Sequence, residues 1–170
     1  MFIQAQVRQS SIGGSGLFAL QPIRRGTIIC FFAEGGKIIT EDQYVAGLSS
    51  GDHDITRTGT RWAGQYFVYG GEPSPTHFIN HSFDPNLLAH CGTFIARRDL
   101  AEGDELTVDY RYLLDTDVAI KTGKVDTTDV GLYHDSATGQ EIRGFGPRES
   151  LLRSTRELLG ILESCEDWTG

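Results

Sequence analysis

Cysteine is scarce in this chain, and its spacing excludes the sites that cysteine usually builds. The 170 residues contain only Cys30, Cys91 and Cys165, and no two of them form a CxxC pair. An odd number of widely spaced cysteines provides no disulfide framework and is typical of a reducing compartment, so we expect an intracellular protein of the cytoplasm or nucleus. Structural zinc sites usually draw on closely spaced cysteines, so we also expect no metal.

Long apolar segments and an excess of positive charge are also lacking. No stretch approaches the ~18 apolar residues of a membrane span, and no basic segment followed by an apolar run opens the chain, so we expect neither a membrane anchor nor a signal peptide. Fifteen Lys and Arg stand against 23 Asp and Glu, a net charge of −8. Direct binding to nucleic acid requires a basic surface and is not expected. The acidic balance favours basic partners, although it also simply keeps a protein soluble.

Glycine, by contrast, is abundant, and its 21 copies favour a turn-rich, mainly β architecture. The length fits one domain, or one domain with a small appendage. Apolar and polar residues alternate, or β-branched and aromatic residues cluster, in several short segments that predict strands. These segments are 2–7, 17–20, 27–32, 37–39, 66–69, 87–91 and 93–97, the last two forming a hairpin around Gly92. The fold class is therefore mainly β, a β-rich α+β protein.

Two segments have helical signals. Thr40 and Gln43 have the spacing of a capping box, which predicts a short helix through Leu48; residues 49–64 favour loop and short strands. Pro147 suits the first position of an amphipathic helix over 147–163. The apolar stripe of that helix is Leu151, Leu152, Thr155, Leu158, Leu159 and Leu162. Such a stripe usually packs on the core and less often forms a dimer seam, so we expect a monomer, or a dimer through this helix.

Three short motifs follow one another along the chain. Residues 14–19 are GSGLFA, residues 77–86 are HFINHSFDPN and residues 105–110 are ELTVDY. In this order they resemble the GxGLFA, RFINHSCxPN and ELTxDY elements of SET-domain lysine methyltransferases, over most of 8–112. The resemblance implies a SET fold, in which small sheets of short strands surround a pseudoknot. It also implies S-adenosylmethionine as methyl donor, S-adenosylhomocysteine as product and a lysine of a histone or other basic protein as acceptor.

The first motif also fits the GxGxxG/A pattern of dinucleotide-binding proteins. That pattern requires a helix directly after the glycines, and Pro22 argues against one here. The plain alternative is a tight hairpin turn. In the resembled family this turn lies against the cofactor, which implies cofactor contacts for Gly14, Ser15, Gly16 and Leu17.

The second motif is centred on Asn80 and His81. Taken alone, these residues are typical of buried polar groups that are satisfied within the core. The resemblance implies that this segment threads beneath a loop near the third motif and binds the cofactor through His77, Phe78, Asn80 and His81. His77 replaces the usual Arg of the family and Phe83 the usual Cys.

The third motif ends at Tyr110, which is either a half-buried packing residue or, by resemblance, the tyrosine whose hydroxyl faces the transferred methyl. The acceptor lysine must be neutral, although its ordinary pKa is ~10.4, and a narrow aromatic channel would lower that pKa by desolvation. The catalytic candidates are Tyr110, Tyr66 and Val108, the last being either a channel residue or an ordinary strand residue. The candidate channel walls are Phe32, Tyr66, Tyr69, Tyr110 and Tyr112.

The remainder of the chain is less distinctive. Residues 135–145 resemble the post-SET segment CxCGxxxCRG with every cysteine missing, so Phe145 either stacks on the adenine or is an ordinary core residue. We therefore divide the chain into a SET domain (1–112), a post-SET-like segment without zinc cysteines (113–146) and a C-terminal helix with its tail (147–170). Two alternatives to the lysine methyltransferase stay open: a catalytically silent SET-fold binding module, and an enzyme that methylates small amines.

Overall fold

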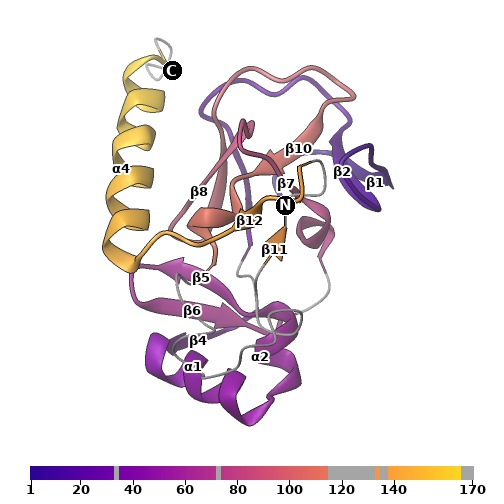
Figure 1. Ribbon diagram of the computed structural model, residues 1–170. Helices are drawn as coiled ribbons and strands as arrows, with labels where there is room; N and C mark the ends of the chain where they lie inside the picture. The colour runs from indigo at the N-terminus through magenta and orange to yellow at the C-terminus, as the bar shows by residue number, and fades with distance from the viewer. Residues whose placement is uncertain (33–34, 72–73, 115–132, 135–137, 166–170) are drawn as a thin grey trace.

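Short strands in three sheets, with helices at their margins, make up the computed structural model of the protein (Figure 1). The structure describes residues 1–32, 35–71, 74–114, 133–134 and 138–165. The predicted class, mainly β with small sheets and a C-terminal helix, is confirmed. No helix in the described ranges has both the length and the apolar character needed to cross a membrane.

The largest sheet carries all three motifs. Its strands run in the order β1-β2-β10-β8-β9-β3, and β7 also pairs with β10. Their bounds are β1 Ala5–Gln9, β2 Ser15–Ala19, β3 Ile28–Phe31, β7 Asn80–His81, β8 Leu87–His90, β9 Thr93–Ala96 and β10 Glu105–Val108. The predicted hairpin is confirmed as β8–β9, whose turn has Cys91 at φ 45° and Gly92 at φ 80°. Two successive positive φ values are typical of the tight turns that match the strand twist.

Strand β10 lies at the centre of this sheet and brings the motifs together. It pairs with β2 in antiparallel orientation and with both β7 and β8 in parallel. Thr107 lies opposite Asn80, and Val108 lies opposite both His81 and Leu87. Beneath these pairs, Leu17, Leu87, Leu106 and Val108 belong to one buried core. The core therefore fixes the positions of three sequence segments that are far apart in the chain.

A smaller unit with its own core lies beside the large sheet, at the bottom of Figure 1. It consists of β4 Lys37–Thr40, β5 Thr60–Ala63 and β6 Tyr66–Tyr69, in the order β4-β6-β5, with α1 Glu41–Ser50 and α2 His53–Thr58 packed on them. Its core contains Tyr44 and Phe67, whose rings stack with centroids 4.0 Å apart. The capping box of Thr40 and Gln43 is confirmed. Helix α2 was not predicted, because six residues are too few to show a helical period; Ile55 is buried in the core of the smaller unit.

Helix α4, Pro147–Glu163, has the predicted bounds but presents an unexpected face to the core. Its buried residues are Ser150, Ser154 and Ile161, and it packs along β8 (Figure 1). The expectation that its leucine stripe covers the core is wrong: Leu151, Leu152, Leu159 and Leu162 are 39–53% exposed. The buried serines bond the opposing surface, Ser154 to His90 of β8 at 2.9 Å and Ser150 to the Tyr112 carbonyl oxygen at 3.2 Å, so the leucines remain on the outer side.

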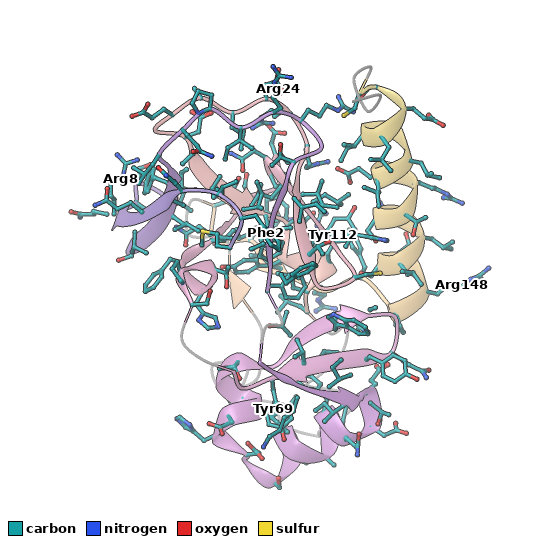
Figure 2. The ribbon with its side chains drawn as sticks, turned by 180° about the vertical axis from the view of Figure 1, so that it is seen from behind. Phe2, Arg8, Arg24, Tyr69, Tyr112 and Arg148 are labelled. Atoms are coloured by element: carbon teal, nitrogen blue, oxygen red, sulfur yellow. The ribbon has the colours of Figure 1, made fainter. Side chains whose placement is uncertain are left out.

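The remaining elements are short. They are the 3₁₀ helices η1 Pro75–Phe78 and η2 Tyr110–Tyr112 and the strand pair β11 Tyr133–His134 with β12 Glu141–Ile142. Part of the post-SET-like segment, residues 115–132 and 135–137, lies outside the described residues. Figure 2, drawn from behind, shows Tyr112 in the half of the molecule that holds the large sheet and Tyr69 in the smaller unit.

Candidate functional site

The side-chain amide of Asn80 joins the three motifs. Its Nδ2 donates to the Ser15 carbonyl oxygen at 3.1 Å and to Glu105 Oε1 at 2.7 Å. The same carboxylate accepts from the Ser10 hydroxyl at 2.8 Å. Gly16 leaves the space that this carboxylate fills, since a Cβ at that position would collide with Glu105 Oε1. The small residue of the first motif therefore makes room for Glu105. The cofactor contact that the family resemblance implies for Gly16 stays a prediction.

Asn86 is the last residue of the second motif, and its side chain forms hydrogen bonds with the backbone of β10, as a neighbouring strand would. Its Nδ2 donates to the Glu105 carbonyl oxygen at 2.7 Å, and its Oδ1 accepts from the Thr107 N–H at 2.8 Å. The side chain is buried, so these two bonds replace the water that it lost. The asparagine therefore locks the second motif to the third, a role that the sequence did not reveal.

Tyr110 is held at both its backbone and its hydroxyl. Its N–H donates to His81 Nδ1 at 3.1 Å, and its hydroxyl donates to the Ile79 carbonyl oxygen at 2.8 Å. Because a backbone N–H can only donate, Nδ1 of His81 is the unprotonated ring nitrogen. The His81 ring also meets Phe83 edge to face, with centroids 4.5 Å apart. Two residues of the second motif thus fix the orientation of the last residue of the third.

A cleft of about 420 Å³ opens between the large sheet and the smaller unit, with Tyr110 in its wall. The described residues that line it include no Asp, Glu, Lys or Arg. Its aromatic lining is Phe32, Phe94 and Tyr110, its polar lining includes Thr58, Thr60, Thr76 and His77, and its aliphatic lining includes Val68, Ile79 and Val108. The cleft therefore combines apolar and polar lining in similar measure, with hydroxyl groups and no charged side chain among the described lining residues, in a concave site of small-ligand size.

The predicted site residues fall into two groups. Tyr110, Val108 and His77 line the cleft. The others lie outside its lining: Gly14, Ser15, Gly16 and Leu17 form the turn and strand beside Asn80, His81 lies behind Tyr110, and Phe78 is 42% exposed. Gly14 has a φ of 53° with open space around it, so a ligand can approach this backbone.

Two tyrosines predicted as channel walls lie elsewhere. Tyr66, at the start of β6, is 42% exposed and outside the cleft lining, whereas Val68 on the same face of that strand lines the cleft. Tyr69 points to the other face of β6 and packs against the core of the smaller unit. Among the predicted walls, Phe32 and Tyr110 reach the cleft.

Phe145 lies in a cluster of aromatic and arginine side chains. The guanidinium groups of Arg111 and Arg153 lie 5.0 and 4.8 Å from its ring centroid, and Tyr112 meets it edge to face at 5.1 Å. Arg111 is in turn paired with Asp109, and this bond raises the pKa of the guanidinium. To stack on an adenine, the Phe145 ring would have to give up its contact with Arg111, Arg153 or Tyr112.

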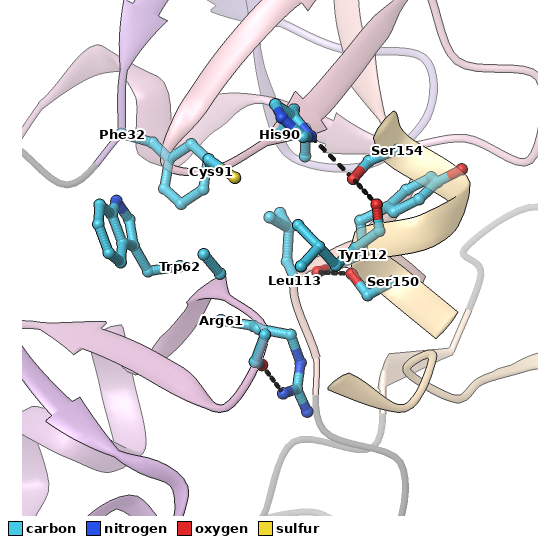
Figure 3. Close-up of a pocket in the computed structure, with 13 residues that line it drawn as sticks. Phe32, Arg61, Trp62, His90, Cys91, Tyr112, Leu113, Ser150 and Ser154 are labelled. Atoms are coloured by element: carbon cyan, nitrogen blue, oxygen red, sulfur yellow. Dashed lines mark hydrogen bonds between the residues drawn. The ribbon is translucent and has the colours of Figure 1, made fainter. Parts of the chain in front are cut away.

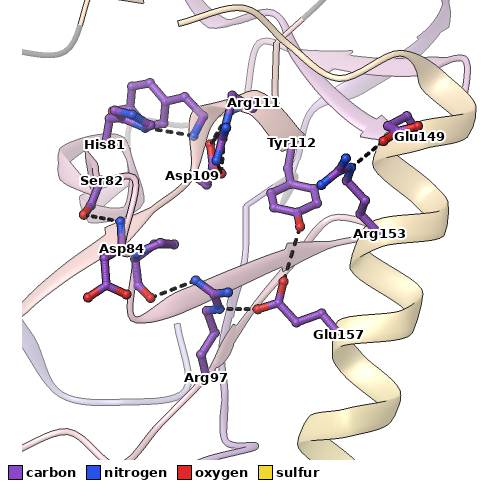
Figure 4. A network of polar contacts seen from close by, with 12 residues as sticks. His81, Ser82, Asp84, Arg97, Asp109, Arg111, Tyr112, Glu149, Arg153 and Glu157 are labelled. Carbon is purple, nitrogen blue, oxygen red and sulfur yellow. Dashed lines mark hydrogen bonds and ion pairs between the residues drawn. The ribbon is translucent and has the colours of Figure 1, made fainter. Parts of the chain in front are cut away.

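A polar network ties helix α4 to the ends of the second and third motifs (Figure 4). Tyr112 donates its hydroxyl hydrogen to Glu157 Oε2 at 3.2 Å, and Glu157 forms an ion pair with Arg97. Arg97 donates to the Pro85 carbonyl oxygen at 3.0 Å. Burial and the neighbouring Glu157 raise the pKa of Tyr112 to about 12, so its hydroxyl stays protonated. Glu157 shows no motif in the sequence, and its role is visible only in the fold.

A second, much smaller cavity lies between α4, β5 and β8 (Figure 3). His90 and Ser154 share a hydrogen bond of 2.9 Å at its edge, and Cys91 and Trp62 line it. Its volume of about 10 Å³ suffices for a water molecule at most, so it is not a substrate site. Burial lowers the pKa of His90.

The described residues contain no group of three or more His, Cys, Asp or Glu side chains that would suit a metal ion. The family model for the SET domain matches residues 14–111, which is 98 of the 170 residues. The match includes all three motifs and most of the residues that line the cleft. SET domains are in general protein-lysine methyltransferases. On this match, and with all three motifs joined around β10, the chain belongs to the SET-domain family.

Proposed function

We propose that this protein transfers a methyl group from S-adenosylmethionine to the side-chain amine of a protein lysine. The observation that carries the proposal is the position of Tyr110, held by Ile79 and His81 in the wall of a cleft whose described lining residues include no Asp, Glu, Lys or Arg. A lysine side chain that enters such a cleft loses its hydration and meets no carboxylate among the described lining residues. Its pKa therefore falls from the ordinary ~10.4, which supplies the neutral amine that methyl transfer requires.

The residues around the cleft suit a nucleoside-type cofactor. The cleft volume of about 420 Å³ lies within the usual range for small-molecule sites, ~300–1,000 Å³. His77, Thr76 and Tyr110 bring polar side chains to the lining of the cleft, and outside this lining the turn at Gly14 has an open backbone that a ligand can approach. When bound, S-adenosylmethionine supplies the methyl carbon, which leaves its sulfur for the lysine nitrogen so that S-adenosylhomocysteine remains.

The protein's own contribution is mainly to position the reactants. The hydroxyl of Tyr110 is directed by Ile79, and its backbone is fixed by His81, so the aromatic wall stays in one orientation. Val108, 1% exposed, and Phe32 shape the same wall. Fixed geometry of this kind can lower the barrier of a group transfer without a strong base. We assign Tyr110 the catalytic position, with Val108 beside it, and give Tyr66 no part.

A basic protein is the most suitable acceptor for a chain with a net charge of −8. Histones are one such class and ribosomal proteins are another. We favour a macromolecular substrate over a free amine because SET domains are in general protein-lysine methyltransferases.

The proposal is tested by incubating the protein with tritium-labelled S-adenosylmethionine and three acceptors: mixed histones, a cell extract and free lysine. The proposal is supported if tritium is incorporated into protein, if a chelator does not prevent this, and if the Tyr110→Ala variant incorporates none. Label in free lysine alone indicates small-amine methylation. Absence of both label and S-adenosylmethionine binding, measured by calorimetry, indicates a silent binding module.

A further inference from the structure

Helix α4 presents an apolar face to solvent. Four of its leucines are 39–53% exposed, and together with Thr155 and Leu158 they form one stripe along the helix, because residues three, four and seven apart share a side. The stripe is Leu151, Leu152, Thr155, Leu158, Leu159 and Leu162. Figure 1 shows the helix at the margin of the molecule, and the buried side of the helix is the one with Ser150, Ser154 and Ile161. Exposed apolar residues gathered on one face mark an interaction surface.

Four of the five leucines in the stripe lie symmetrically about Thr155, and the fifth, Leu162, lies seven residues after it, opposite the position of Arg148. Leu151 lies four residues before Thr155 and Leu159 four residues after it, and Leu152 and Leu158 lie three residues before and after. A two-fold axis through Thr155 would therefore bring Leu151 of one copy to Leu159 of a second copy. Interfaces between identical chains with two-fold symmetry require this kind of self-complementary surface.

The charges at the ends of the helix favour the same arrangement. Arg148 is exposed at the beginning of α4 and Glu163 at its end, and the midpoint between them falls next to Thr155. In an antiparallel pair, Arg148 of one copy meets Glu163 of the other. In a parallel pair, each would meet its own like charge, which is repulsive. Figure 2 shows Arg148 on the outer side of the helix, directed away from the molecule.

We propose that two copies of the chain associate through this leucine stripe as an antiparallel helix pair with a two-fold axis near Thr155. The 17-residue helix is ~25 Å long, so the interface is small and we expect a dissociation constant in the micromolar range, roughly 1–100 μM. No stripe residue lines the larger cleft, so both clefts stay open in the dimer. The proposal does not depend on the methyltransferase activity.

Sedimentation velocity over a range of concentrations measures the association directly. We expect the mass to rise from 18.7 kDa toward twice that value as concentration increases. Leu152→Glu/Leu159→Glu should keep the protein monomeric, since both positions are exposed and glutamate suits a helix. The matched control is Leu20→Glu, which replaces a leucine of 40% exposure on another part of the surface and should leave the dimer intact.

Charge reversal tests the orientation. Arg148→Glu and Glu163→Arg should each weaken the dimer several-fold, and the double variant should restore it to within about twofold. Neither change harms the helix itself, because a negative charge at its start and a positive charge at its end both favour the helix dipole. A protein that is monomeric at all concentrations would overturn the proposal. A dimer that survives the double leucine variant, or that the charge swap does not restore, would do the same.

Discussion

Asn80 donates a hydrogen bond of 2.7 Å to the carboxylate of Glu105 and a second, of 3.1 Å, to the carbonyl oxygen of Ser15. These two bonds connect the three segments of the SET signature in space. Both hydrogens of the amide are thereby used within the protein. In the proposed function Asn80 therefore holds the turn of the first motif, and its two partners give a direct test.

We expect Asn80→Ala to weaken S-adenosylmethionine binding by about 5- to 150-fold. The loss of a donor to a partly buried carboxylate costs roughly 1–3 kcal/mol and releases the Ser15 turn. Isothermal calorimetry measures the change. Glu105→Gln is the matched control, because an amide oxygen still accepts from Asn80, and it should lose much less affinity. Equal affinity in wild type and Asn80→Ala would show that the turn is held without this residue.

Tyr110→Phe should reduce turnover by about tenfold or more and change S-adenosylmethionine affinity by less than about threefold. The variant removes the hydroxyl that donates to Ile79 and so frees the ring at the wall of the cleft. Tyr112→Phe is the control: its hydroxyl bonds Glu157, outside the cleft lining, and turnover should stay close to wild type. Full activity of Tyr110→Phe would make this tyrosine a packing residue only.

The number of methyl groups added depends on the space around the amine. Neither Val108 nor Phe32, both in the cleft lining, carries a hydroxyl, so the cleft should accept an already methylated amine and the enzyme should proceed beyond one methyl. Phe32→Tyr should shift the product toward monomethyl-lysine, as read by mass spectrometry of a reacted peptide. Phe31→Tyr, at a half-exposed neighbour, should change nothing. A wild-type product that stops at one methyl contradicts the idea. Val108→Tyr is unsuitable, because Val108 is 1% exposed and a larger side chain would overpack the sheet.

Folding stability should decrease as the pH falls below ~6.5, in part through His90. Burial lowers the pKa of His90 in the folded state, so the unfolded chain binds more protons in this range and protonation favours unfolding. The contribution of neutral His90 to folding stability is fully present above the pKa that this histidine has in the unfolded chain. We expect wild type to lose more thermal stability than His90→Gln between about pH 8 and about pH 5.5, measured by circular dichroism. An equal loss in both proteins would exclude His90 as a source of the pH dependence.

Two ion pairs on helix α4 should differ in their contribution to stability. Glu157, paired with Arg97 and Tyr112, has a side chain that is 23% exposed, whereas Glu149, paired with Arg153, is 54% exposed. Glu157→Ala should lower the free energy of unfolding by about 1–2 kcal/mol, because it leaves partly buried partners without a bond. Glu149→Ala should cost less than about 0.5 kcal/mol. Urea denaturation measures both, and comparable losses would argue against a special role of the Glu157 network.

Much of the local structure was determined by the sequence. The capping box of Thr40 and Gln43, the hairpin at Gly92 and the bounds of α4 were all predicted correctly. Each of these depends on residues a few positions apart, so the chain contains the whole signal. The three motifs likewise indicated the family, because their order is a property of the sequence itself.

The tertiary structure decided which of these residues meet. Asn80 bonds Ser15 and Glu105, which are 65 and 25 residues away, and no local pattern encodes those partners. Helix α4 is amphipathic whether its leucine stripe faces the core or the solvent, and only the burial of Ser150, Ser154 and Ile161 against the rest of the fold turned the stripe outward. Periodicity specifies that a helix has two faces. Packing against the remainder of the chain selects which face is buried, because the shape of the opposing surface is made by residues distant in sequence.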